Sequence, residues 1–163
     1  MSARAAWRLE DLGFNKVFRY TAGKLDWLAH GLPAEGEFAR SAHVGDLACC
    51  EVPTCCPEDK VSEVGKRVYA AGWDVCVVVN EARVVLGLLR GPALAADAGN
   101  TAEDVMELAP RTYRPYVSPE TALGYMQKNG LDCVLVTDSD GVLWGTLSRA
   151  DAERVQANQP DEE

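Results

Sequence analysis

The sequence of 163 residues contains no long hydrophobic run. Its longest apolar stretches, such as VCVVV at 75–79, are far shorter than the roughly 20 residues that a membrane-spanning helix needs. No apolar stretch of the kind found in a secretory signal follows Met1. We therefore expect a cytoplasmic protein without a membrane partner.

Histidine is almost absent, with only two residues in the chain. No nucleophile, base and orienting acid fall together in a pattern typical of an active site. The sequence therefore argues against an enzyme.

Positive charge is also scarce, because 16 basic residues face 25 acidic ones and the formal net charge is -9. Residues 1–40 are nearly balanced, whereas residues 41–163 carry ten basic and twenty acidic side chains. An acidic surface repels phosphate backbones, so this balance disfavours nucleic acid as a partner. A local site for a small anion stays open.

The six cysteines do not have the spacing of a zinc site. Four of them form two adjacent pairs in CCEVPTCC at 49–56, whereas zinc ligands usually occur as pairs separated by two to four residues. We expect reduced thiols with the packing role of small apolar side chains, and no metal site. The alternative is a thiol or metal sensor built on Cys49, Cys50, Cys55 and Cys56.

What the chain does contain is an internal repeat. Sliding the sequence by 58 positions aligns residues of the same kind without a gap. The matched pairs include Asp46 and Asp104, Thr54 and Thr112, Pro57 and Pro115, Gly72 and Gly130, Asp74 and Asp132, Val84 and Val142, and Gly87 and Gly145. A long period carried only twice predicts two structural copies, because a solenoid needs more repeats to bury its faces.

Each repeat has the pattern of a strand, an amphipathic helix, two strands and a short helix. We predict an α+β fold of α/β-like character, made of two βαββα repeats. The expected organisation is an N-terminal segment at 1–40, repeats at 41–99 and 100–156, and a disordered tail at 157–163.

The lead-in stretches VGDLA and AEDVM, together with GTLSRAD at 145–151, make the repeat pair resemble a tandem CBS-domain pair, also called a Bateman module. The resemblance implies two copies packed through their sheets, with clefts that bind an adenosine-containing ligand. The ligand classes it implies are AMP, ADP, ATP, NAD-type molecules and S-adenosylmethionine, with no required cofactor. It also implies a homodimer.

The motif GTLSRAD allows two interpretations. Backbone N–H groups at a strand-to-helix junction favour a phosphate, and the carboxylate of Asp151 could accept hydrogen bonds from a ribose diol near Ser148. The same Ser-x-x-Asp spacing is a capping box that needs no ligand. Both roles can coexist.

The first repeat has Arg90 and Ala93 at the equivalent positions, which cannot hold a ribose diol. Arg90 could still reach a ligand in the neighbouring cleft, and Arg149 is a candidate phosphate partner. By the resemblance, the other ligand-binding candidates are Thr112, Tyr113, Arg114, Cys133, Val134 and Thr146.

The first forty residues predict a helix ending near Gly13, a strand at 16–20 and a second helix at 24–31. Residues 2–36 resemble the closing portion of a rhodanese domain, without the loop that carries its nucleophilic cysteine. No cysteine precedes Cys49, so we expect no sulfur transfer.

Together these patterns predict a non-catalytic regulatory module that senses an adenosine-type ligand. The alternative is a dimerisation or docking module whose clefts are vestigial.

Overall fold

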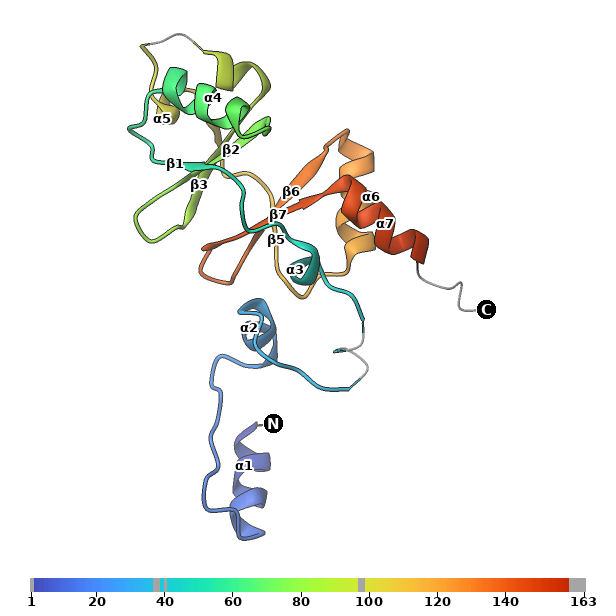
Figure 1. Ribbon diagram of the computed structural model, residues 1–163. Coiled ribbons are helices and arrows are strands. Elements are labelled where there is room, and N and C mark those ends of the chain that lie inside the picture. The colour runs from blue at the N-terminus through green and yellow to red at the C-terminus, as the bar shows by residue number, and fades with distance from the viewer. Residues whose placement is uncertain (1, 37–38, 40, 97–98, 159–163) are drawn as a thin grey trace.

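The computed structural model describes residues 2–36, 39, 41–96 and 99–158, and two small sheets organise this part of the chain (Figure 1). The first sheet has the strand order β1-β2-β3-β4 and the second the order β5-β6-β7. The described residues include no helix with the length and hydropathy needed to span a membrane.

The elements that we call copy one are β1 (Thr54–Cys55), α4 (Val61–Ala70), β2 (Val75–Val79), β3 (Val85–Arg90) and the 3-10 helix η2 (Gly91–Ala95). β2 pairs parallel with β1 and antiparallel with β3. Every residue of β2 is buried, because α4 packs on one face of the sheet and copy two on the other. The final helix is a short 3-10 turn that begins at Gly91 and Pro92.

The equivalent elements, copy two, are β5 (Thr112–Tyr113), α6 (Pro119–Asn129), β6 (Cys133–Thr137), β7 (Leu143–Ser148) and α7 (Arg149–Asn158). Ser118 caps α6 by accepting a hydrogen bond from the Thr121 amide, and the helix ends at Gly130 with a left-handed φ of 64°. The predicted α+β fold of two βαββα units is confirmed.

The segments that lead into the two copies are exchanged between them. The lead-in helix α3 (Val44–Leu47) precedes copy one but packs in the core of copy two, and α5 (Ala102–Val105) packs in the core of copy one. Backbone pairing follows the same rule: Cys49 bridges to Thr146 on β7, and β4 (Glu107–Leu108) pairs with β3. Each copy therefore completes its core with a segment that belongs to the other repeat.

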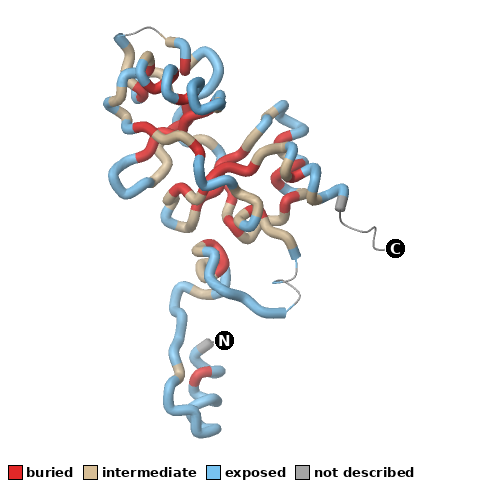
Figure 2. The backbone as a smooth tube through the Cα atoms, in the orientation of Figure 1, coloured by how far each residue is buried: buried red, intermediate tan, exposed pale blue. Residues whose placement is uncertain are grey.

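The two sheets also meet along an approximate two-fold axis. The hairpin turns pair at Val84 and Val142, which are 58 positions apart. On either side, the Val85 amide donates to the Gly141 carbonyl at 3.0 Å and the Leu143 amide donates to the Arg83 carbonyl at 2.9 Å. Apolar residues from both sheets form a shared core cluster between them. The buried residues accordingly run through both copies in Figure 2.

The first part of the N-terminal segment is largely exposed, and α1 (Ser2–Asp11) lies away from the sheets (Figures 1 and 2). The segment also contains α2 (Lys24–Ala29), and α1 leaves Trp7 63% exposed. The strand expected at 16–20 is wrong: these residues have no strand partner, and Phe18 is 89% exposed. A strand needs a neighbour for its backbone groups, which the local pattern alone does not provide.

Helix α2 is attached to the β6–β7 turn of copy two through His30. The His30 Nδ1 atom lies 3.0 Å from the Asp26 carbonyl oxygen and 3.1 Å from the Ser139 hydroxyl. The Ser139 hydroxyl donates to the Asp26 carboxylate at 3.0 Å, and the His30 Nε2 atom lies 3.5 Å from the Asp140 carboxylate. The hydrogen bond to the Asp26 carbonyl raises the pKa of His30 most, and the acidic side chains around it add to this rise.

The first prediction concerns two equivalent glycines at the crossing of the exchanged segments. A Cβ at Gly145 would overlap the backbone carbonyl of Cys49, whereas a Cβ at Gly87 would mainly meet the flexible side chain of Met106 and would lie 3.0 Å from the Glu107 carbonyl oxygen. Gly145→Ala should therefore lower the free energy of unfolding by about 2 kcal/mol, and Gly87→Ala by about half as much. Urea denaturation of both variants measures the difference, and equal losses would contradict this description of the crossing.

The second prediction is that docking of α2 depends on pH. Because the pKa of His30 is raised above its unfolded value, the stabilisation is complete below about pH 6.5 and is lost as pH rises through the raised value. Amide hydrogen exchange of α2, corrected for intrinsic rates, should therefore accelerate as the pH rises above about 6.5. His30→Gln should abolish this dependence. His43→Gln is the control for the other imidazole, and persistence of the effect in His30→Gln would exclude His30 as its origin.

Candidate functional site

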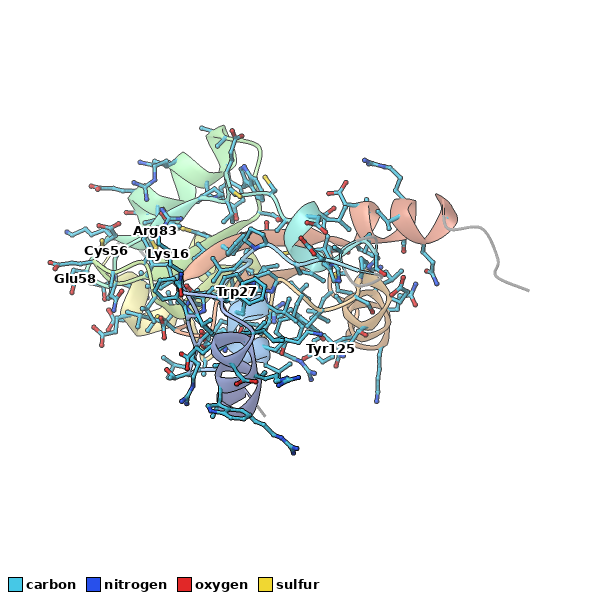
Figure 3. All side chains as sticks on the ribbon, turned by 90° about the horizontal axis from the view of Figure 1, so that it is seen from below. Lys16, Trp27, Cys56, Glu58, Arg83 and Tyr125 are labelled. Atoms are coloured by element: carbon cyan, nitrogen blue, oxygen red, sulfur yellow. The ribbon has the colours of Figure 1, made fainter. Side chains whose placement is uncertain are left out.

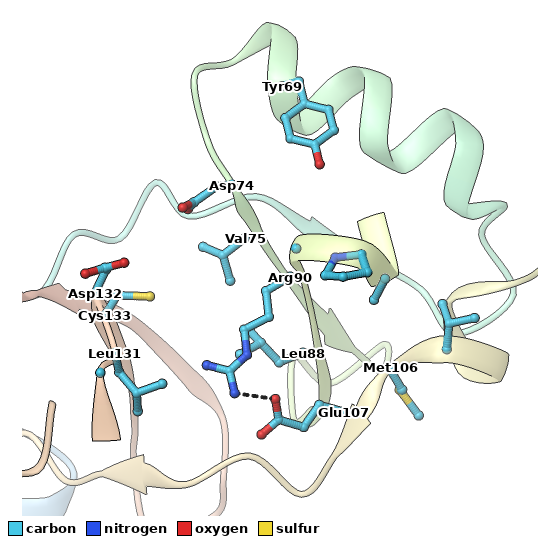
Figure 4. Close-up of a pocket in the computed structure, with 15 residues that line it drawn as sticks. Tyr69, Asp74, Val75, Leu88, Arg90, Met106, Glu107, Leu131, Asp132 and Cys133 are labelled. Carbon is cyan, nitrogen blue, oxygen red and sulfur yellow. Dashed lines mark hydrogen bonds and ion pairs between the residues drawn. The ribbon is translucent and has the colours of Figure 1, made fainter. Parts of the chain in front are cut away.

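A cavity of about 650 Å³ lies between the two copies, at the junction where β3 leads into η2 (Figure 4). Copy one contributes the junction residues Arg90 to Ala93 and the apolar side chains of Val75 and Leu88. Copy two contributes the turn that leads from α6 into β6, residues 130–133. The volume is typical of a site for a small organic molecule.

Three carboxylates and one guanidinium line this cavity among the described residues. Arg90 donates to the Glu107 carboxylate at 2.6 Å, as the dashed line in Figure 4 shows, and both side chains are about half exposed. Asp74 and Asp132 lie on the opposite wall in the same view. The exchange of lead-in segments places Glu107 here, because β4 pairs with the strand that carries Arg90.

The charged side chains of the cavity affect the pKa of Cys133, which lies on the cavity wall. Burial is the main reason that the pKa of its thiol is raised. The carboxylates of Asp74 and Asp132 raise the pKa further, and Arg90 opposes them. The thiol is therefore protonated near neutral pH, which disfavours both nucleophilic chemistry and metal binding.

Ser148 and Asp151 are bound to each other at the start of α7. The Ser148 hydroxyl accepts a hydrogen bond from the Asp151 amide at 3.1 Å and donates to the Asp151 carboxylate at 2.6 Å. The other carboxylate oxygen lies 3.2 Å from a guanidinium nitrogen of Arg154. In this structure Ser148 and Asp151 therefore form a helix cap. Neither residue lines the 650 Å³ cavity.

Arg149 forms hydrogen bonds and an ion pair with the turn before β6. Its guanidinium donates to the Leu131 carbonyl and lies 3.2 Å from the Asp132 carboxylate, while its amide donates to the Asp132 carbonyl at 2.8 Å. These bonds position the copy-two wall of the cavity.

The remaining predicted residues are dispersed. Thr146 is buried and pairs with Cys49, and Tyr113 lies in the core of copy two, where its hydroxyl has no hydrogen-bond partner. Thr112 pairs with β6 through its backbone. Arg114 donates to the hydroxyl and carbonyl of Thr137.

A smaller cavity of about 270 Å³ adjoins the first and shares the Arg90–Glu107 pair with it. Val134 and Cys133 line this smaller cavity, together with Arg111. The Arg111 guanidinium carbon lies 4.3 Å from the ring centroid of Tyr125, in a cation–π contact. The two cavities therefore group Arg90, Cys133 and Val134. Ser148 and Asp151 line neither cavity, although Ser148 pairs with Cys133 between β7 and β6.

Sequence reasoning missed the acidic residues Asp74, Glu107 and Asp132. The repeat did align Asp74 with Asp132, which was a usable signal. Glu107 gave none, because its place in the cavity results from the exchange of segments.

The cysteines of the CCEVPTCC stretch are dispersed as well. Cys49, Cys50 and Cys56 are exposed, and Figure 3 shows Cys56 beside Glu58 at the outer edge of copy one. Cys55 is buried against Cys76, which raises the pKa of Cys55. Among the described residues, the one group with three ligand atoms within 4.8 Å of one another is His30, Asp138 and Asp140, and it contains no cysteine.

Residues 102–158 match the family model of the CBS domain. Solved structures of the same fold include CBSX2, an Arabidopsis thaliana CBS-pair protein, in complex with AMP. The AMP complex has a TM-score of 0.66 and 19% sequence identity over 72% of this chain and 97% of that chain. Residues 102–158 are therefore similar to a CBS domain, and the two copies together have the fold of a CBS-domain pair.

Two further structures have this fold. The cytosolic domain of the Mg2+ channel MgtE, in complex with ATP, has a TM-score of 0.65 and 21% identity over 72% of this chain and 51% of that chain. A CBS-domain pair in complex with 5′-methylthioadenosine and S-adenosyl-L-methionine has a TM-score of 0.64 and 18% identity over 74% and 99% of the respective chains.

Among curated proteins, the GMP reductase of Mycobacterium tuberculosis is 27% identical over 130 residues, which are 79% of this chain. The chain spans only 27% of the length of that relative.

The third prediction tests the cap. Ser148→Ala removes the acceptor of the Asp151 amide and should lower the free energy of unfolding by about 1 kcal/mol. Ser62→Ala, which changes a serine within α4, is the matched control and should have little effect. Urea denaturation measures both variants, and an unchanged stability of Ser148→Ala would contradict the capping role.

Proposed function

We propose that this protein is a non-catalytic regulatory module that binds an adenosine-containing ligand between its two copies. The observation that carries the proposal is the 650 Å³ cavity lined by residues of both copies. A ligand in that position touches both sheets, so its binding can change how the copies pack. Three proteins of the same fold support this ligand class. One structure contains AMP, one contains ATP, and one contains both 5′-methylthioadenosine and S-adenosylmethionine.

We assign no reductase activity to the chain, because it matches about a quarter of the length of the GMP reductase relatives. The role of Ser148 and Asp151 as ribose contacts remains a prediction, as do the homodimer, the cytoplasmic location and the rhodanese-like origin of residues 2–36. For Asp151 to bind a ribose diol, its carboxylate must first leave Ser148 or Arg154.

The second candidate is a docking or dimerisation module. The observation that favours it is the exposed apolar surface of the N-terminal segment, where Trp7, Phe14 and Phe18 are all more than half exposed. An excess of exposed large apolar side chains in one short segment often marks a site of protein contact.

The fourth prediction separates the two candidates. A ligand at a hundred times its dissociation constant should stabilise the protein by about 2.7 kcal/mol, which raises the melting temperature by several degrees. Thermal melting with AMP, ADP, ATP, NAD and S-adenosylmethionine, each at millimolar concentration, should show such a shift for at least one compound. No shift with any of the five would reject the sensor and leave the docking module.

The variant Asp151→Ala locates the bound compound in the same assay. If the carboxylate holds the ribose, the loss of its hydrogen bonds should weaken binding by about 2 to 4 kcal/mol. A ligand confined to the 650 Å³ cavity should bind Asp151→Ala as tightly as it binds the parent protein, because Asp151 does not line that cavity.

A further inference from the structure

The charges around the 650 Å³ cavity decide which adenosine compound fits it. The described lining residues carry three carboxylates and one guanidinium. Arg149 does not line the cavity but lies 3.2 Å from the Asp132 carboxylate, so the wall and this partner together have an excess of one negative charge at neutral pH. The single guanidinium, Arg90, is already paired with Glu107 at 2.6 Å. Asp74 and Asp132, on the opposite wall, are both exposed to the cavity side and to solvent.

The junction itself has little to offer a phosphate. Pro92 lacks a backbone N–H, and η2 is a 3-10 turn of five residues, so its dipole is small. A phosphate in this cavity would approach two carboxylates and would have to compete with Glu107 for Arg90. Each such approach is unfavourable in a partly desolvated site.

The same walls suit a nucleoside whose substituent is uncharged or positive. Val75, Leu88 and Leu131 provide apolar surface for a purine, and the Tyr69 ring lies at the rim of the cavity (Figure 4). Carboxylates accept hydrogen bonds from ribose hydroxyls and attract an ammonium or sulfonium group. The raised pKa of Cys133 agrees with a negative potential at this wall.

We propose that the cavity between the copies selects an adenosine derivative with zero or positive net charge, of which S-adenosylmethionine and adenosine are examples, over adenosine phosphates. This inference rests on the proposed function and names the ligand class of the same site. The carboxylates of Asp74 and Asp132 bind the ribose hydroxyls and the cationic substituent. The ion pair with Glu107 keeps the Arg90 guanidinium from binding a phosphate.

Two basic residues outside this cavity must be considered. Arg149 lies 3.2 Å from the Asp132 carboxylate and also donates to the Leu131 carbonyl, so its guanidinium is already engaged by the protein. Arg111 lines the adjoining cavity of about 270 Å³ and stacks on Tyr125. A nucleotide that reached across the Arg90–Glu107 pair could place its phosphate there. Such a nucleotide would bind the parent protein well and would lose affinity in Arg111→Gln.

The fifth prediction is tested by isothermal titration calorimetry of the full chain with S-adenosylmethionine, adenosine, AMP and ATP. S-adenosylmethionine should bind at least about tenfold more tightly than AMP, and added salt should weaken its binding. Glu107→Gln removes one negative charge and releases Arg90. It should raise the affinity for AMP about fivefold and lower that for S-adenosylmethionine by a similar factor.

Glu81→Gln is the matched control, because Glu81 lies exposed in the turn between β2 and β3 and does not line the cavity. It makes the same change in net charge and should leave all four affinities within about twofold. Thermal melting of each variant verifies that it is folded.

Two results would overturn the inference alone. One is AMP or ATP binding as tightly as S-adenosylmethionine, above all if Arg111→Gln abolishes the binding. The other is an equal response of Glu107→Gln and Glu81→Gln. Failure of all four compounds to bind would instead remove the proposed function, and the inference with it.

Discussion

The exchange of lead-in segments is the constraint on which the structure depends. The bridges from Cys49 to Thr146 and from Glu107 to Leu88 occupy equivalent positions, 58 residues apart. Each bridge gives the outer strand of one sheet a backbone partner from the other repeat, so neither copy can separate without exposing hydrogen-bonding groups and core residues. The exchanged segments cross directly over Gly87 and Gly145, which leaves no room for a side chain at these two positions.

This exchange also makes the two junctions chemically different. Glu107 arrives beside Arg90 on β4, while the equivalent position beside Ser148 is Cys49. The first junction thus becomes an ion pair beside an open cavity, and the second becomes a closed helix cap. Two copies with one fold have therefore acquired different surroundings at the same structural position.

Much of the fold could be predicted from the sequence, because each copy has clear periodic patterns and ends its main helix at a glycine, Gly72 or Gly130. Pairing between segments could not be predicted, since local patterns do not say which sheet a short strand will join. For this reason the exchange was missed, and a strand was expected at 16–20 where the chain has no partner. The residues of the candidate site likewise fall into a group that the sequence predicted and a group that it did not. Arg90 and Cys133 were predicted and line the cavity, whereas the contribution of Glu107 arises only in three dimensions.

The turn between β6 and β7 has two neighbours. On one side Ser139 and Asp140 hold His30, and with it helix α2. On the other side the Gly141 carbonyl accepts a hydrogen bond from Val85 of copy one. Because the bonds of this one turn reach both copy one and α2, a change in how the two sheets pack would also alter the contacts of α2. The short loop is thus a direct mechanical link between the interface of the two copies and the second helix of the N-terminal segment.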